Sequence, residues 1–155
     1  TKKEMEKFQS ELDRLCLSLA RKTASDGEGA TKRIEIKVKG CRSGEDARKI
    51  ARTVATSPLV KTAMFGNDAN WGRVLAAVGR AGVAIRPEKI EVLFGPLRVA
   101  RRGCAVPFSE RQALAVLKKD VVPLTIHLHQ GKSEASYLAC DFSLDYVKIN
   151  AEYRT

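Results

Sequence analysis

Residues 26–32 read DGEGATK and place one acidic side chain, Glu28, between two glycines. A carboxylate can accept hydrogen bonds from an amine or take up a proton during a reaction. Glycine lacks a Cβ, so the backbone around Glu28 can turn freely and leaves the carboxylate without a bulky neighbour. Three interpretations follow: a phosphate-binding loop, a plain turn before a strand, or a loop that presents Glu28 to a substrate.

The phosphate-loop interpretation fails on spacing and context. That loop requires G-x-x-x-x-G-K-[ST] followed by a helix, whose N-terminal amides hold the phosphate. A strand follows DGEGATK, and the spacing differs. A second segment, QGKS at residues 130–133, has the required ending, but Ile126 stands where the first glycine belongs. We therefore expect no nucleotide-binding loop.

His127 and His129 stand two residues apart in a predicted strand and should share one face. Two imidazoles on one face could begin a metal site, but no third ligand is evident. A solvent-facing edge is the favoured interpretation, and no metal is predicted. No serine or cysteine lies in a recognisable nucleophile motif.

Thr1 raises the question of an N-terminal nucleophile, because an N-terminal threonine can use its own α-amine as the base. However, the first residues, TKKEMEK, read as the charged start of a helix. A nucleophile is normally held on a rigid element inside a pocket. The sequence alone therefore disfavours Thr1 as a nucleophile.

The N-terminal half should consist of helices around one strand. Residues 3–24 carry an apolar stripe with helical spacing, and the glycines of SDGEG end that helix. Residues 33–40 alternate apolar and polar side chains, which predicts a half-buried strand. Ser43 should cap the next helix, Pro58 should interrupt it, and residues 71–82 should form another.

The C-terminal half should contain two hairpins separated by a helix. Residues 89–103 turn at Gly95-Pro96, and residues 123–143 turn at 130–133. Ser109 should cap the helix between these hairpins, whereas residues 144–155 show no strong period. This order predicts a mixed α/β (α+β) fold with residues 1–155 as a single layered domain.

The composition is that of a globular protein with a basic surface. The chain has 44% hydrophobic residues and a formal charge of +10. Only 6% of its residues are aromatic, and none interleaves with the basic clusters RVARR and LKKD as a base-stacking surface would. A solvated face or a contact with an acidic partner chain is therefore favoured over nucleic acid.

Four cysteines fit no zinc motif, and we expect buried, reduced thiols at Cys16, Cys41, Cys104 and Cys140. The charged N-terminal residues do not resemble a signal peptide. No apolar run approaches the ~18 residues that a membrane-crossing helix needs. A cytoplasmic protein without membrane association is expected.

Three motifs carry a family resemblance: DGEGATK, SPLVKTAMFGNDANWGRVLAAVGRAG at residues 57–82, and DYVKINAEYRT at residues 145–155. With them the chain resembles the β chain of the bifunctional glutamate N-acetyltransferase, or ornithine acetyltransferase, family of arginine biosynthesis. The resemblance covers essentially all 155 residues. It implies the C-terminal part of the β chain of a self-cleaving α/β-chain enzyme with an α2β2 assembly.

The resemblance implies transfer of an acetyl group from N-acetylornithine to glutamate in a ping-pong cycle through a threonine acetyl-enzyme. Some family members also use acetyl-CoA, which is then a substrate, so no cofactor is implied. The partner is the α chain of the same precursor. Thr1 heads the helix that leads into DGEGATK and does not match the family's nucleophile, which is expected upstream of these residues.

Three positions match the family's substrate-binding residues: Glu28, Asn150 and the terminal Thr155. Glu28 could receive a hydrogen bond from a substrate amine, and Asn150 can both donate and accept. Trp71 and its helix are interpreted as core or chain interface, and Lys61, Asn67, Asp68 and Asn70 as residues that support the site. The alternative hypothesis is a basic RNA-binding α/β domain.

Overall fold

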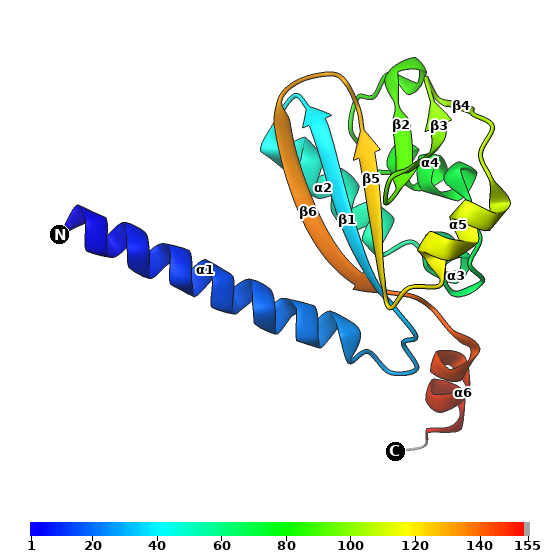
Figure 1. Ribbon diagram of the computed structural model, residues 1–155, viewed down its shortest axis with the longest axis horizontal. Helices are drawn as coiled ribbons and strands as arrows, with labels where there is room; N and C mark the ends of the chain where they lie inside the picture. The colour runs from blue at the N-terminus through cyan, green and yellow to red at the C-terminus, as the bar shows by residue number, and fades with distance from the viewer. Residues whose placement is uncertain (154–155) are drawn as a thin grey trace.

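The computed structural model describes residues 1–153, which form a mixed sheet of six strands with helices against one face (Figure 1). The strand order is β4-β3-β2-β5-β1-β6. The strands are β1 (Arg33–Cys41), β2 (Glu91–Phe94), β3 (Leu97–Arg101), β4 (Cys104–Ala105), β5 (Val121–His127) and β6 (Ser133–Cys140). The helices are α1 (Lys2–Ser25), α2 (Gly44–Ala55), α3 (Pro58–Phe65), α4 (Trp71–Gly79), the short 3₁₀ helix η1 (Pro87–Lys89), α5 (Glu110–Leu117) and α6 (Leu144–Glu152).

Strand β1 confirms the predicted alternation. Ile34, Ile36 and Val38 are fully buried, while the residues between them reach the opposite face. The strand runs parallel to β5 on one side and antiparallel to β6 on the other. Because β1 is hydrogen-bonded along both edges, it is the middle strand of the three longest ones, β5, β1 and β6.

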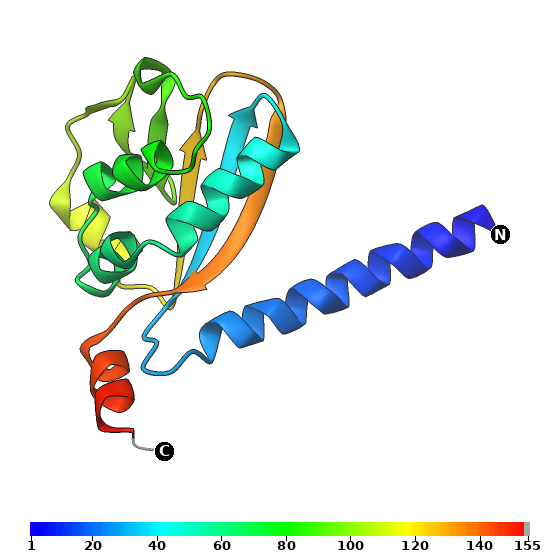
Figure 2. The same cartoon turned by 180° about the vertical axis from the view of Figure 1, so that it is seen from behind.

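Helices α2, α3 and α4 cover the face to which these three side chains point (Figure 2). Helix α2 packs on β1 and β6 through a stripe that includes the buried Ile50 and Val54. Each fully buried aliphatic side chain of this kind contributes about 1.5–3 kcal/mol relative to an exposed one. The core therefore lies between this helical layer and one face of the sheet.

Side-chain caps start the helices where the sequence predicted. The Ser43 hydroxyl accepts a hydrogen bond from the Asp46 amide at 3.1 Å, and Ser109 does the same for the Gln112 amide at 3.3 Å. Pro58 is the first residue of α3, so it separates that helix from α2. The β2–β3 hairpin around Gly95 also agrees with the prediction.

The second predicted hairpin is wrong, because β5 and β6 are separated by β1. Residues 128–132 do not turn back on β5 but cross the end of β1. The Leu128 amide bonds to the Lys39 carbonyl at 2.9 Å, and the Gln130 amide bonds to the Gly40 carbonyl at 2.7 Å. A turn-like sequence between two strands cannot reveal that a third strand lies between them.

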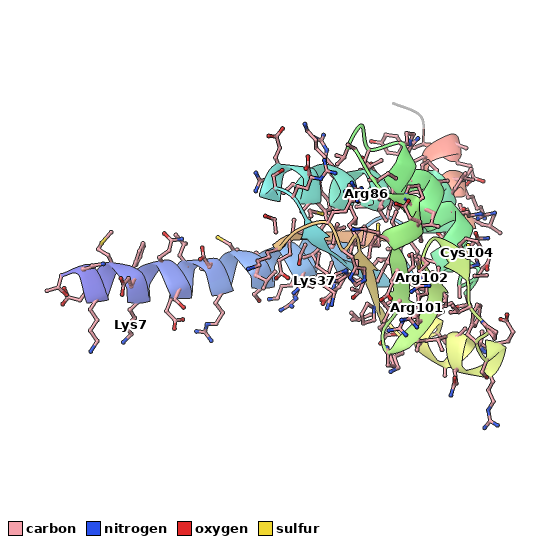
Figure 3. The ribbon with its side chains drawn as sticks, turned by 90° about the horizontal axis from the view of Figure 1, so that it is seen from above. Lys7, Lys37, Arg86, Arg101, Arg102 and Cys104 are labelled. Carbon is pink, nitrogen blue, oxygen red and sulfur yellow. The ribbon has the colours of Figure 1, made fainter. Side chains whose placement is uncertain are left out.

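Helix α1 has the predicted limits within a residue or two, but its apolar stripe is not part of the core. Met5, Phe8 and Leu15 are 67%, 63% and 56% exposed, and no side chain of this fully described helix is buried. Only the C-terminal part of α1 lies near the sheet. The N-terminal half of α1, marked by Lys7, projects away from the rest of the molecule (Figures 1 and 3).

The prediction of four buried thiols is correct for Cys41, and burial together with the nearby Asp46 carboxylate raises the pKa of that thiol. Cys16 and Cys104 are exposed, and Cys140 is half-buried. Cys16 is exposed because α1 packs on little else, and Cys104 because it lies in the edge strand β4. Across residues 1–153, no helix is both long and apolar enough to cross a membrane.

Gly131 has a steric role that can be tested. A Cβ at this position would lie 2.1 Å from the Cys41 carbonyl oxygen, whereas one at Gly79 would meet nothing within 4 Å. We expect Gly131→Ala to lower the free energy of unfolding by about 1–3 kcal/mol. The control Gly79→Ala should stabilise the helical backbone by up to about 1 kcal/mol. Urea unfolding of both variants measures the difference. Equal midpoints would contradict the close approach of Gly131 to Cys41 where residues 128–132 cross the end of β1.

His127 should make stability depend on pH. It ends β5, and its ring lies 3.5 Å, centroid to centroid, from that of His129, which follows in a left-handed conformation. Burial lowers the pKa of His127, His129 and Lys39 lower it further, and Glu91 opposes them.

Because the unfolded state then binds a proton more readily, the His127 contribution is complete above the unfolded pKa of about 6.5 and declines as pH falls below it. We expect His127→Gln, which keeps an acceptor, to flatten the decline of the urea midpoint between about pH 7.5 and pH 5. Parallel curves for variant and wild type would show that His127 does not cause the decline.

Candidate functional site

The pairing of β1 with β6 brings two distant segments together. Arg33, the first residue of β1, lies opposite Cys140, the last residue of β6. Because the two strands are antiparallel, the loop that enters β1 and the segment that leaves β6 meet at the same end of the sheet. The loop carries Glu28, and the segment leads into α6, which carries Asn150.

Glu28 lies on a tight turn at the end of α1. Asp26 caps the helix C-terminus, and the Ala30 amide bonds to the Gly27 carbonyl at 2.9 Å. This turn directs the exposed Glu28 side chain towards α6. The plain-turn interpretation is therefore correct, since the turn places the carboxylate, and the presentation of Glu28 to a substrate stays a prediction.

Glu28 and Asn150 are in direct contact. The Asn150 Nδ2 donates to Glu28 Oε2 at 2.9 Å and also to the Tyr146 carbonyl one turn back in α6, at 2.9 Å. The structure thus joins two of the three predicted substrate-binding residues, which are 122 positions apart. The third, Thr155, lies outside the described residues, and its role stays a prediction.

Gly29 allows the loop and α6 to approach this closely. It has φ of 63°, and a Cβ there would lie 2.5 Å from the Tyr146 amide nitrogen. The Ser143 hydroxyl, which caps α6 by accepting from the Tyr146 amide at 3.2 Å, donates to the Gly29 carbonyl. Gly29 therefore serves the contact with α6 as well as the freedom of Glu28.

Helix α6 itself was missed by the sequence reasoning. Its residues are all exposed, and its apolar side chains form no buried stripe whose period could have marked a helix. The available signal was Ser143, a preferred N-cap residue three positions before Tyr146. Asp141, which binds the Glu28 loop, carried no recognisable signal in the sequence.

The arrangement suits recognition of a polar substrate. Asn150 bonds to one carboxylate oxygen of Glu28, so the other oxygen can accept from an amine. The Asn150 amide oxygen remains a further acceptor. Both side chains are exposed, so other parts of a larger protein can reach them. Among residues 1–153, no group of three or more His, Cys, Asp or Glu side chains could hold a metal ion.

The four residues predicted to support the site divide into two groups. Asn67 is linked to the loop, since its Oδ1 accepts from Lys32 Nζ at 2.6 Å, and Lys61 lies over the Phe142 ring at 5.7 Å, just before α6. Asn70 instead caps α4 by accepting from the Arg73 amide at 3.0 Å, and it donates to Asp68 at 2.9 Å.

Thr1 acts as a helix cap and lies far from the Glu28 loop. Its hydroxyl accepts from the Glu4 amide at 3.4 Å. At 1.5 Å per residue, the 24 residues of α1 place it roughly 36 Å from the other end of the helix. That Thr1 is not the nucleophile stays a prediction.

Comparison with known proteins gives one family. The ArgJ family model matches residues 1–155. The arginine biosynthesis bifunctional proteins ArgJ of Desulfotalea psychrophila and Geobacillus stearothermophilus are 50% and 43% identical over 151 and 150 residues, each 97% of this chain. This chain spans 38% and 37% of their lengths.

A crystal structure of the arginine biosynthesis bifunctional protein ArgJ from Bacillus halodurans matches with a TM-score of 0.93 and 40% sequence identity. The match covers 96% of this chain and 70% of that chain. The predicted mixed α/β fold and the resemblance to this family are both confirmed.

Gly29 and Gly82 form a matched pair for testing the loop. Both have positive φ, but a Cβ at Gly82 would meet nothing within 4 Å. Alanine at either position should cost about 1–2 kcal/mol in backbone strain. Gly29→Ala should also push α6 away, costing a further 1–3 kcal/mol or so and raising hydrogen exchange at residues 144–152. Equal exchange in the two variants would refute the close approach.

Proposed function

This chain belongs to the ArgJ family, and on that premise we propose that it is part of an acetyltransferase that moves the acetyl group of N-acetylornithine to glutamate. A threonine hydroxyl attacks the acetyl carbonyl, the C–N bond breaks and ornithine leaves with a proton. The glutamate amine then attacks the ester and restores the threonine. Two such steps replace one difficult amide exchange.

Within this cycle, Glu28 and Asn150 bind the amino-acid portion of the substrates. The observation that carries this proposal is the 2.9 Å contact between their side chains, which come from opposite ends of the chain. A carboxylate can hold a substrate ammonium group, and an amide can donate or accept. That combination suits ornithine and glutamate, which share an amino-acid head and differ in side-chain charge.

The nucleophilic threonine and the donors that stabilise the oxyanion belong to other parts of the protein. Support comes from the curated relatives, of which this chain spans only 38% or less in the examples above. The capping role of Thr1 provides independent support. Oxyanion donors must be preorganised around the reacting carbonyl, and a partner chain can supply them.

The remainder of the precursor, including its α chain in an α2β2 assembly, is the proposed partner. The apolar stripe of α1 supports this, because Met5, Phe8 and Leu15 are more than half exposed in the described chain. A helix with such a stripe normally packs against another element. Acetyl-CoA acts, where it is used, as a second acetyl donor, and no cofactor is required.

The RNA-binding alternative has weaker support. In the basic cluster RVARR, Arg98 and Arg101 lie 3.7 and 3.5 Å from the Glu91 carboxylate, which offsets part of their charge. Lys37, on the open face of the sheet (Figure 3), pairs with Glu134 at 2.9 Å. The family membership favours the acetyltransferase.

Glu28→Gln in the complete enzyme tests the proposal. It keeps the size of the side chain but removes the charge that holds an ammonium group. Charge-assisted hydrogen bonds are worth about 1.5–3 kcal/mol, so kcat/KM should fall about 10- to 100-fold. Glu134→Gln is the control, because within residues 1–153 that exposed glutamate forms an ion pair only with Lys37 on the neighbouring strand β1. Wild-type steady-state kinetics for Glu28→Gln would refute its role.

A further inference from the structure

Asp141 is a buried carboxylate that binds the Glu28 loop. It follows β6 directly and is 3% exposed. Its Oδ1 accepts from the Thr31 amide at 2.8 Å and from the Lys32 amide at 3.1 Å, and its Oδ2 accepts from the Thr31 hydroxyl. Its own amide donates to the Lys32 carbonyl at 3.2 Å. One side chain thus satisfies three donors within three or four residues of Glu28.

The same residue lies three positions before Leu144, the first residue of α6, and two before its N-cap, Ser143. Ser143, the α6 cap, donates to the Gly29 carbonyl, and Gly29 abuts the Tyr146 backbone. Helix α6 has no buried side chain. Polar contacts from Ser143 and Asn150 hold α6 against the loop, and Asp141 bonds the segment just before α6 to Thr31 and Lys32 at the end of the loop.

Lys32 fixes the far end of the loop in the core. Its Nζ donates to Asn67 Oδ1 at 2.6 Å and to the Leu117 carbonyl, at the C-terminus of α5, at 2.9 Å. The negative end of the α5 dipole favours a cation at that place. Burial lowers the pKa of Lys32, and the Asp141 charge opposes that shift. Lys32 thus ties the end of the loop to Asn67 and to α5, and Asp141 ties it to the segment between β6 and α6.

We propose that Asp141 is a positioning residue, which holds residues 29–32 against the start of α6 so that Glu28 and Asn150 bind the substrate as one unit. The proposal rests on the proposed function of that pair. It assigns Asp141 no contact with the substrate. Its effect on transfer should therefore pass through Glu28.

Two substitutions of Asp141 separate geometry from charge. In Asp141→Asn, the amide oxygen can still accept from both backbone amides, and the amide nitrogen can donate to the Thr31 hydroxyl. In Asp141→Ala all three contacts are lost. In the complete enzyme we expect Asp141→Ala to lower kcat/KM about tenfold or more, mainly through KM, and Asp141→Asn to stay within about threefold of wild type. Exposed Asp145, four residues on, gives the control Asp145→Ala.

A double-mutant cycle with Glu28→Gln tests whether the effect passes through Glu28. In the Glu28→Gln background, adding Asp141→Ala should cost less than about threefold, because coupled residues are not additive. Additive losses, or equal losses for Asp141→Ala and Asp141→Asn, would overturn the proposal. If Asp141→Ala fails to fold, Thr31→Val removes the hydroxyl contact alone and must show the same non-additivity with Glu28→Gln.

Hydrogen–deuterium exchange of the complete enzyme separates failure of this proposal from failure of the proposed function. Asp141→Ala should raise exchange at residues 26–32 and 144–152 but not in β1, and Asp141→Asn should leave all three unchanged. If Glu28→Gln has wild-type kinetics, the function proposed for Glu28 is lost while exchange still decides whether Asp141 holds the loop. Unchanged exchange in Asp141→Ala would overturn the positioning role.

Discussion

The antiparallel pairing of β1 with β6 is the constraint on which the site depends. Its register sets Arg33 opposite Cys140, so residues just before β1 and just after β6 must emerge side by side. The backbone ladder, not a local sequence motif, therefore brings Glu28 to Asn150. Helix α2 packs on both strands and fixes their position from the buried side of the sheet.

Two kinds of force hold the two parts of the molecule. The sheet and its helical layer are held by apolar burial, in which residues such as Ile34 and Ile50 are fully buried. The site lies outside that core and is held by directed polar contacts from Asp141, Ser143 and Lys32. Hydrogen bonds fix distance and angle more narrowly than apolar contact does, which suits a pair that must bind a small substrate.

The sequence predicted what local periodicity and capping determine. The alternation of β1, the Ser43 and Ser109 caps and the break at Pro58 all follow from nearest-neighbour chemistry. It could not predict the separation of β5 from β6, because that depends on which strand lies between them. The expected burial of Cys16 on the apolar stripe of α1 is wrong for a related reason: periodicity identifies an apolar face but not what covers it. Glu28 and Asn150 were predicted from the family resemblance, whereas the contact between them is known only from the fold.

The strand pairing also separates the end of the sheet that carries Glu28 from the opposite end. β1 has nine residues, so its two ends lie roughly 30 Å apart. At the end opposite Glu28, β3 and β4 are joined by Arg102 and Gly103, both with positive φ, and Cys104 is exposed (Figure 3). A fluorophore on the Cys104 thiol would lie roughly a full strand length from Glu28. This end of the molecule is a natural attachment point for a reporter that leaves the binding pair undisturbed.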